Sequence, residues 1–208
     1  MDTDFILALA RAAVEQPEPE PEQQLDERSL TLRLTLSPSR VVVCEQDRAV
    51  GIGGVAWQAS VALSHAMGHD KQLFPSWAGQ RVLELGCGTA LCGLSAWALG
   101  AGDVVLTDAA QCGPVVQRSI NATRVSAADD EPVGAITYAA LRWGDPVPEA
   151  AAREFDVVVG SDLTYDTDDH QKLLRTLVDV CQLNAHTRVV LAHQQRALSE
   201  TVRTHDTI

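Results

Sequence analysis

The sequence predicts an α/β fold with a doubly wound, mostly parallel sheet. Short apolar segments alternate with helical segments from residue 81 to residue 192. Parallel strands need crossover connections of this kind, and such crossovers are right-handed. The first of these strands runs into the turn Gly86-Cys87-Gly88, and ligands of doubly wound sheets bind beyond the carboxyl ends of the strands. The 208 residues suit one such domain with a short extension.

The first 28 residues differ in composition from the rest of the chain. We expect a short helix within residues 1–15. Proline and glutamate alternate through residues 16–24, which offer nothing to bury and predict a disordered acidic linker that is dispensable for ligand binding. The folded domain is therefore expected to comprise residues 29–208.

The domain begins with a predicted β-hairpin and continues with a regular strand–helix alternation. Leucines at every second position from Leu30 to Leu36 indicate a half-buried strand, Ser37-Pro38-Ser39 a turn, and residues 41–44 a second strand. The glycines at 51, 53 and 54 predict a flexible approach to a helix over 57–67. Strands are expected at 81–85, 104–107, 135–138, 155–159 and 188–192, helices at 91–99, 114–124 and 168–181, and a polar loop at 126–132.

Composition disfavours two classes of partner. The formal net charge is −12, so the surface repels phosphate backbones and no nucleic acid is expected, although acidity can serve solubility alone. No apolar run reaches the roughly 20 residues of a membrane span, and Asp2 and Asp4 precede the short apolar stretch near the N-terminus where a secretory signal is basic.

The five cysteines form no CxxC pair, which suits reduced thiols in the cytoplasm or the nucleus.

The glycine turn indicates a ligand other than a dinucleotide. A dinucleotide fingerprint has a third glycine three residues after Gly88, where this chain has Leu91. Glu84 lies just before the first glycine, where a carboxylate would repel a pyrophosphate and tolerate a cation. The alternative is an ordinary strand–turn–helix connection in which Glu84 is merely exposed.

Asp108 follows the next strand, about 20 residues beyond the glycine turn. An acid at this spacing suits the two hydroxyls of a ribose, because one carboxylate accepts both protons. The alternative is a helix N-cap, a position that aspartate also favours. The two roles are compatible.

Five blocks of sequence resemble those of the class I, seven-strand S-adenosylmethionine (SAM) dependent methyltransferases. More narrowly they resemble methyltransferase family 16, the lysine methyltransferases acting on non-histone proteins. The blocks are Glu84–Leu94, Gly54–Leu63, Leu141–Gly144, Ser161-Asp162-Leu-Thr-Tyr165-Asp166 and His193–Arg196. The resemblance implies the Rossmann-like sheet of class I methyltransferases. In the second block Gln58 stands where the family often has Pro or Asp.

The resemblance also implies roles for particular residues. SAM, which leaves as S-adenosylhomocysteine, is expected to contact Trp57, Glu84, Gly86, Cys87, Gly88, Asp108, Trp143 and Ser161. Asp162 and Tyr165 are expected to face the incoming lysine. The alternatives are core packing for the two tryptophans and a helix cap for Asp162. No metal is expected, since His65 and His69 have no evident third ligand.

The implied activity is methylation of a lysine in a chaperone, an AAA ATPase or a translation factor, by an enzyme expected to be monomeric. The DNA, RNA and glutamine amino-methyltransferases carry two prolines inside the block that begins here at Asp162, and this chain has neither. An arginine, histidine or small-molecule acceptor stays open, as does a SAM-binding adaptor without activity. Family members continue with a helix and two antiparallel strands, and only about a dozen residues follow Arg196, so we expect a truncated C-terminal strand pair.

Overall fold

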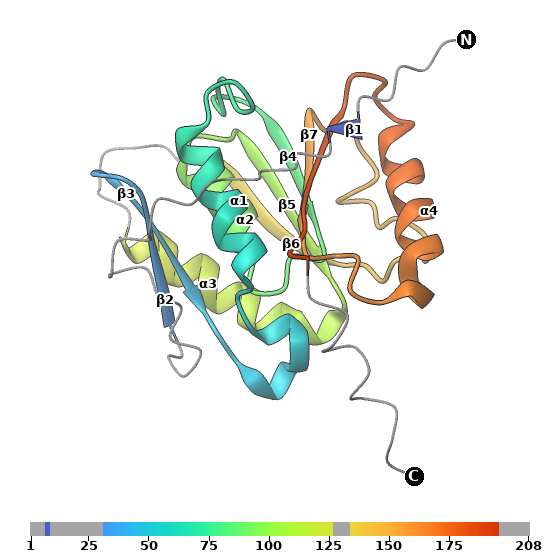
Figure 1. Cartoon of the computed structure of the whole chain (residues 1–208), viewed down its shortest axis with the longest axis horizontal. Helices are drawn as coiled ribbons and strands as arrows, with labels where there is room; N and C mark the ends of the chain where they lie inside the picture. The colour runs from blue at the N-terminus through green and yellow to red at the C-terminus, as the bar shows by residue number, and fades with distance from the viewer. Residues whose placement is uncertain (1–6, 9–30, 127–133, 196–208) are drawn as a thin grey trace.

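A parallel sheet forms the centre of the molecule (Figure 1). The computed structural model describes residues 7–8, 31–126 and 134–195. Within them the order of strands is β1-β8-β7-β4-β5-β6, and every neighbouring pair is parallel. The strands are β1 (Leu7–Ala8), β4 (Arg81–Leu85), β5 (Asp103–Asp108), β6 (Ala135–Ala140), β7 (Val157–Ser161) and β8 (Arg188–Ala192).

The sheet is doubly wound, as the sequence predicts. From β4 the chain moves outward through β5 to β6, then returns to the other side of β4 as β7 and continues to β8. The order therefore reverses between β4 and β7, and the crevice beyond their carboxyl ends is the expected place for a ligand. The connecting helices are α2 (Leu91–Ala98), α3 (Gly113–Ser126) and α4 (His170–Cys181), and α1 (Gln58–His69) precedes the sheet.

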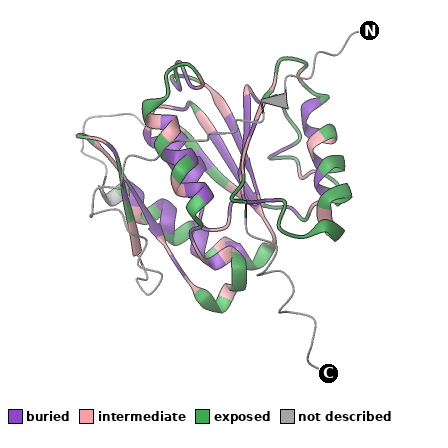
Figure 2. Ribbon diagram, viewed as in Figure 1, coloured by how far each residue is buried: buried purple, intermediate pink, exposed green. Residues whose placement is uncertain are grey.

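The two faces of the sheet are covered unequally. Alternate strand residues such as Val82 and Val104 pack on one face with α1, α2 and α3. Their neighbours Leu83 and Val105 pack on the other face with α4. The alternation follows from the two-residue period of a strand. Figure 2 shows the central strands buried, whereas α4 has an exposed outer side.

A separate hairpin lies outside the helices on the first face. It consists of β2 (Thr31–Ser37) and β3 (Arg40–Glu45), which pair antiparallel. Side chains of α3 bind the backbone of β3. The N–H of Val43 donates to Thr123 Oγ1 at 3.1 Å, and the N–H of Glu45 donates to Ser119 Oγ at 2.9 Å. These bonds satisfy backbone groups at an edge that would otherwise be open.

Several predictions about the elements need correction. The prediction of a helix within residues 1–15 is wrong at Leu7–Ala8, where the chain is extended and pairs with Val189 and Val190 of β8. Without β1, this edge of β8 would be unpaired, and its backbone groups can bind an added strand. Local helix propensity does not anticipate such a partner. The strand expected to begin at residue 155 begins at Val157. The last helix begins at His170, because Thr167–Asp169 form a 3-10 turn, η4.

Other predictions lie outside the described residues. They concern the linker at 16–24, the greater part of the polar loop at 126–132 and the truncated C-terminal strand pair. In the described part of the chain, no helix combines the length and the apolar character needed to cross a membrane.

Candidate functional site

A cavity of about 930 Å³ opens at the carboxyl ends of β4, β5, β6 and β7. Its walls come from the turn after β4, the residues that follow β5, β6 and β7, the first turns of α4, and the 3-10 segment η2 (Arg48–Gly54). This is the crevice at the reversal of strand order. Its volume is in the range of roughly 300–1,000 Å³ that is usual for small-molecule sites.

The glycine turn after β4 forms one wall of the cavity. Gly86 and Gly88 have φ angles of 59° and 53°, in the left-handed region that favours glycine. A Cβ on Gly86 would lie 2.7 Å from Cδ2 of Leu163 and 2.9 Å from Cζ2 of Trp143. Both the backbone conformation and the close packing therefore require glycine at position 86.

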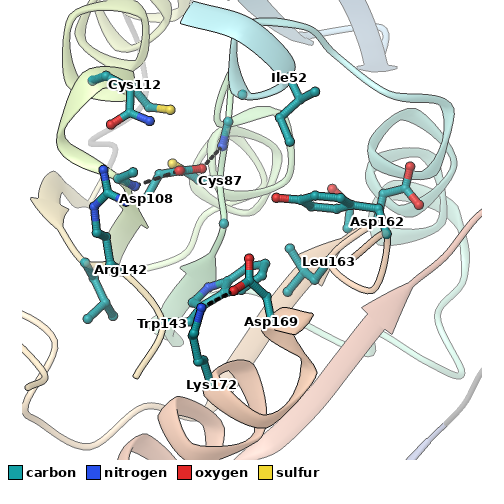
Figure 3. A pocket seen from close by; sticks show the side chains of 18 of the residues that line it. Ile52, Cys87, Asp108, Cys112, Arg142, Trp143, Asp162, Leu163, Asp169 and Lys172 are labelled. Atoms are coloured by element: carbon teal, nitrogen blue, oxygen red, sulfur yellow. Dashed lines mark hydrogen bonds and ion pairs between the residues drawn. The ribbon is translucent and has the colours of Figure 1, made fainter. Parts of the chain in front are cut away.

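Asp108 ties this turn to the end of β5. Its Oδ2 accepts the N–H of Gly88 at 2.7 Å, and its Oδ1 accepts the N–H of Ala109 at 2.7 Å (Figure 3). Each carboxylate oxygen has a second lone pair, so hydroxyl donors can bind there as well. The structure thus gives Asp108 a role in holding two loops while leaving it on the cavity wall.

Glu84 lies apart from the cavity, beneath the glycine turn. Its side chain is 1% exposed, and Oε2 accepts the N–H of Gly93 in the first turn of α2 at 2.7 Å. The N-cap residue Ala90 makes no side-chain cap bond, so Glu84 caps the helix from the neighbouring strand. Burial raises the pKa of Glu84 to about 8, helped by the nearby charge of Asp108. The structure shows no side-chain access for Glu84 to a ligand in the cavity.

The two tryptophans assigned to the cofactor lie at the cavity. Trp57 is 39% exposed, and its Nε1 donates to the carbonyl of Ile52 in η2 at 3.0 Å. Trp143 is partly buried beside Gly86 and lies below the cavity in Figure 3. By contrast, Trp77 and Trp97 are packed in the core, with 3% and 2% of their surfaces exposed.

Asp162 lies directly beyond β7, on the side of the cavity opposite Asp108 (Figure 3). Its side chain is 4% exposed, and its φ of 57° is unusual for a residue with a Cβ. The other role considered for Asp162 was that of a helix cap. Asp166 caps η4 instead, because its Oδ1 accepts the N–H of Asp168 at 2.9 Å. Tyr165 also lines the cavity, with 52% of its surface exposed. Partial burial and the charge of Asp169 raise the pKa of Tyr165.

The structure brings together nine of the ten residues assigned to the site from the sequence, and Glu84 is the exception. The nine are Trp57, Gly86, Cys87, Gly88, Asp108, Trp143, Ser161, Asp162 and Tyr165.

Sequence reasoning missed two parts of the cavity wall. Val50, Ile52 and Gly53 of η2 face the cavity, where the sequence predicted only a flexible approach. On α4, Lys172 lines the cavity and pairs with Asp169 at 2.6 Å (Figure 3). The glycines around Ile52 were a signal for a close backbone approach. A lysine on an exposed helix face gives no comparable signal.

Comparisons with known proteins agree with this fold and identify the family. Residues 36–205 match the family model of the lysine methyltransferases, methyltransferase family 16. The mouse protein N-lysine methyltransferase METTL21A is 30% identical over 148 residues, covering 71% of this chain and 64% of that protein. The EEF1A lysine methyltransferase 3 of Xenopus tropicalis is 30% identical over 147 residues, covering 71% and 60%. The chain thus spans less than two thirds of the length of these relatives.

A solved structure from Streptococcus mutans, of a protein proposed to be a SAM-dependent methyltransferase, resembles the fold with a TM-score of 0.51 at 12% identity. The match covers 84% of this chain and 44% of the Streptococcus mutans chain. The fold is therefore that of the class I methyltransferases. Within that class, the chain belongs to the lysine methyltransferase family.

Proposed function

We propose that this chain is a SAM-dependent methyltransferase that modifies a lysine side chain of a non-histone protein. One observation carries the proposal. Asp162 and Tyr165, which follow β7, open into the same cavity as the glycine turn that follows β4. A carboxylate beside the expected cofactor site can hold a lysine amine in line with a methyl donor, and alignment is the main requirement of such a transfer.

The residues of the cavity fit SAM. The cavity is large enough, the turn at Gly86 and Gly88 brings backbone close to it, and Asp108 retains acceptor capacity for ribose hydroxyls. Trp143 offers an aromatic surface for a base. When bound, SAM supplies a methyl group that its positive sulfonium makes electrophilic.

Asp162 has the central role in the proposed mechanism. A lysine amine has a pKa of about 10.4 in water and must be neutral to attack. Asp162 accepts a hydrogen bond from the amine and fixes its direction, while Tyr165 forms part of the channel wall. A nearby sulfonium disfavours the ammonium form and so promotes loss of its proton. Because the side chain of Asp162 is buried, little water can compete with the amine for its carboxylate.

The relatives suggest the kind of acceptor. One carries the name of an EEF1A lysine methyltransferase, and another that of a protein N-lysine methyltransferase. We propose a translation factor, a chaperone or an AAA ATPase as the substrate, a monomeric enzyme, and a location in the cytoplasm with the nucleus as a second site.

Labelled SAM distinguishes this function from its alternatives. Incubating the purified chain with a cell lysate and methyl-labelled SAM should give a labelled protein band whose acid hydrolysate contains methyl-lysine. Methyl-arginine or methyl-histidine would instead identify another acceptor, and label in small molecules alone would exclude a protein. SAM binding without any label would indicate an adaptor. An Asp162→Ala variant is the background control.

Replacing Asp108 should weaken SAM binding. Asp108→Ala removes the acceptors for the ribose and releases the N–H groups of Gly88 and Ala109, so we expect a loss of about 1–3 kcal/mol measured by calorimetry. Asp108→Asn keeps one carbonyl acceptor and should lose less. Unchanged affinity in the alanine variant would remove Asp108 from the ribose site.

Deleting residues 1–24 should leave SAM binding unchanged. The described cavity wall begins at Val50, and β1 pairs with β8 at the end of the sheet farthest from β6. A chain starting at Leu25 should therefore match the affinity of the full chain in calorimetry. A large loss of affinity would show that the N-terminal segment contributes to the site.

A further inference from the structure

We propose that His193 is a positioning residue that holds the carboxylate of Asp162 in place. His193 follows β8, and Asp162 follows β7, the neighbouring parallel strand (Figure 1). Nδ1 of His193 lies 3.3 Å from Oδ1 of Asp162. The proposal rests on the proposed function, since it assigns to His193 the orientation of the group that aligns the lysine.

Asp162 needs support because its backbone is in a rarely populated conformation. A φ of 57° is unfavourable for an ordinary L-residue, although aspartate tolerates it better than most. Such a conformation persists where surrounding contacts determine it. Here the N–H of Asp162 donates to the carbonyl of Ala192 at 2.7 Å, and the next residue, His193, reaches the side chain. The end of β8 therefore contacts Asp162 through both its backbone and its carboxylate.

The neighbours of His193 favour one tautomer. Nδ1 also lies 3.1 Å from Oγ1 of Thr164, in a hydrogen bond between the two side chains. A carboxylate only accepts, so a proton on Nδ1 makes the contact with Asp162 attractive, and the hydroxyl of Thr164 can accept from the same N–H. A bare Nδ1 would instead direct a lone pair at the carboxylate. The proposal therefore assigns His193 the Nδ1–H form, in which the contact with Asp162 is attractive.

The position of His193 separates support from direct contact with substrate. Its side chain is 46% exposed, and it lies outside the cavity wall to which Asp162 belongs. His193 therefore contacts the cavity wall through Asp162 without forming part of that wall. His193 acts on the reaction through the direction of the carboxylate.

Single-turnover and steady-state kinetics of the full chain test this role. His193→Ala should reduce kcat about tenfold while KM for the protein substrate and the affinity for SAM change less than twofold, because alignment is lost and binding is kept. In His193→Asn the amide can place an N–H near the position of Nδ1 and should restore kcat to within about threefold of the parent. His186→Ala, which replaces an exposed histidine in the turn just before β8, is the matched control and should behave like the parent.

The outcomes are distinct. A kcat in His193→Ala equal to that of the parent overturns the inference, as does an asparagine variant that is as slow as the alanine variant, which would indicate a proton-transfer role. Melting temperatures report whether the variants are folded. Nitrogen-15 NMR of the imidazole gives a readout that needs no activity. Nδ1–H should predominate in the parent and lose its preference in Asp162→Asn, whereas an Nε2–H form in the parent overturns the inference. An inactive parent chain that shows the Nδ1–H form would contradict the proposed function and leave the support of Asp162 intact.

Discussion

Asp162→Ala should reduce methyl transfer by about a hundredfold or more while SAM binds nearly as before. The carboxylate is 4% exposed on the cavity wall, opposite Asp108, so its loss removes the group that directs the amine and leaves the cofactor loops untouched. Single-turnover methylation and calorimetry on the same preparation measure the two effects. Activity per folded molecule equal to that of the parent would refute the catalytic role of Asp162.

The backbone of Asp162 determines the control for this experiment. Alanine at a φ of 57° adds strain, so a lower melting temperature in Asp162→Ala is expected whatever the residue does in catalysis. Asp162→Asn tolerates this conformation and removes only the charge, so it should keep most of the stability and still lose turnover. Tyr165→Phe should cost less activity than either variant, since the half-exposed ring still forms the wall.

Glu84→Gln should stabilise the protein increasingly as the pH rises from about 4.5 to about 8. Burial raises the pKa of Glu84 from 4.5 to about 8. Across this range the unfolded chain ionises Glu84 while the folded protein keeps it protonated, so the wild type loses stability as the pH rises through the folded pKa. Linkage puts the full difference on the order of 4–5 kcal/mol, which glutamine avoids while still accepting from Gly93.

Chemical denaturation of both proteins between pH 4 and pH 9 measures this difference. The difference in the free energy of unfolding should be smallest below pH 4.5, grow with pH, and level off above about pH 8. Glu149→Gln is a suitable control because Glu149 is exposed, and its difference from the wild type should stay flat. A flat difference for Glu84→Gln as well would show that Glu84 is ionised in the folded protein.

The sequence determined the parts of this protein that depend on local pattern. The strands at Arg81–Leu85 and Arg188–Ala192 have the predicted bounds, because runs of branched and leucine side chains end there at polar or glycine residues. The order of strands and helices predicted the doubly wound sheet, and the glycine turn predicted where the cavity lies. Motif residues at the ends of four different strands could be assigned to one site because parallel strands have their carboxyl ends at the same edge.

The tertiary structure decided which way individual side chains face and which distant residues meet. The carboxylate of Glu84 caps α2 and does not reach the cavity. The position of Glu84 near a strand end could not predict this, because the contact depends on how the helix packs against the strand. The contact between His193 and Asp162 arises only because β8 and β7 are neighbours in register. Similarly, η2 lines the cavity because Trp57 and the packing of Gly53 against Cys112 hold it there. These contacts join residues far apart in the chain, and neither periodicity nor motif spacing encodes their geometry.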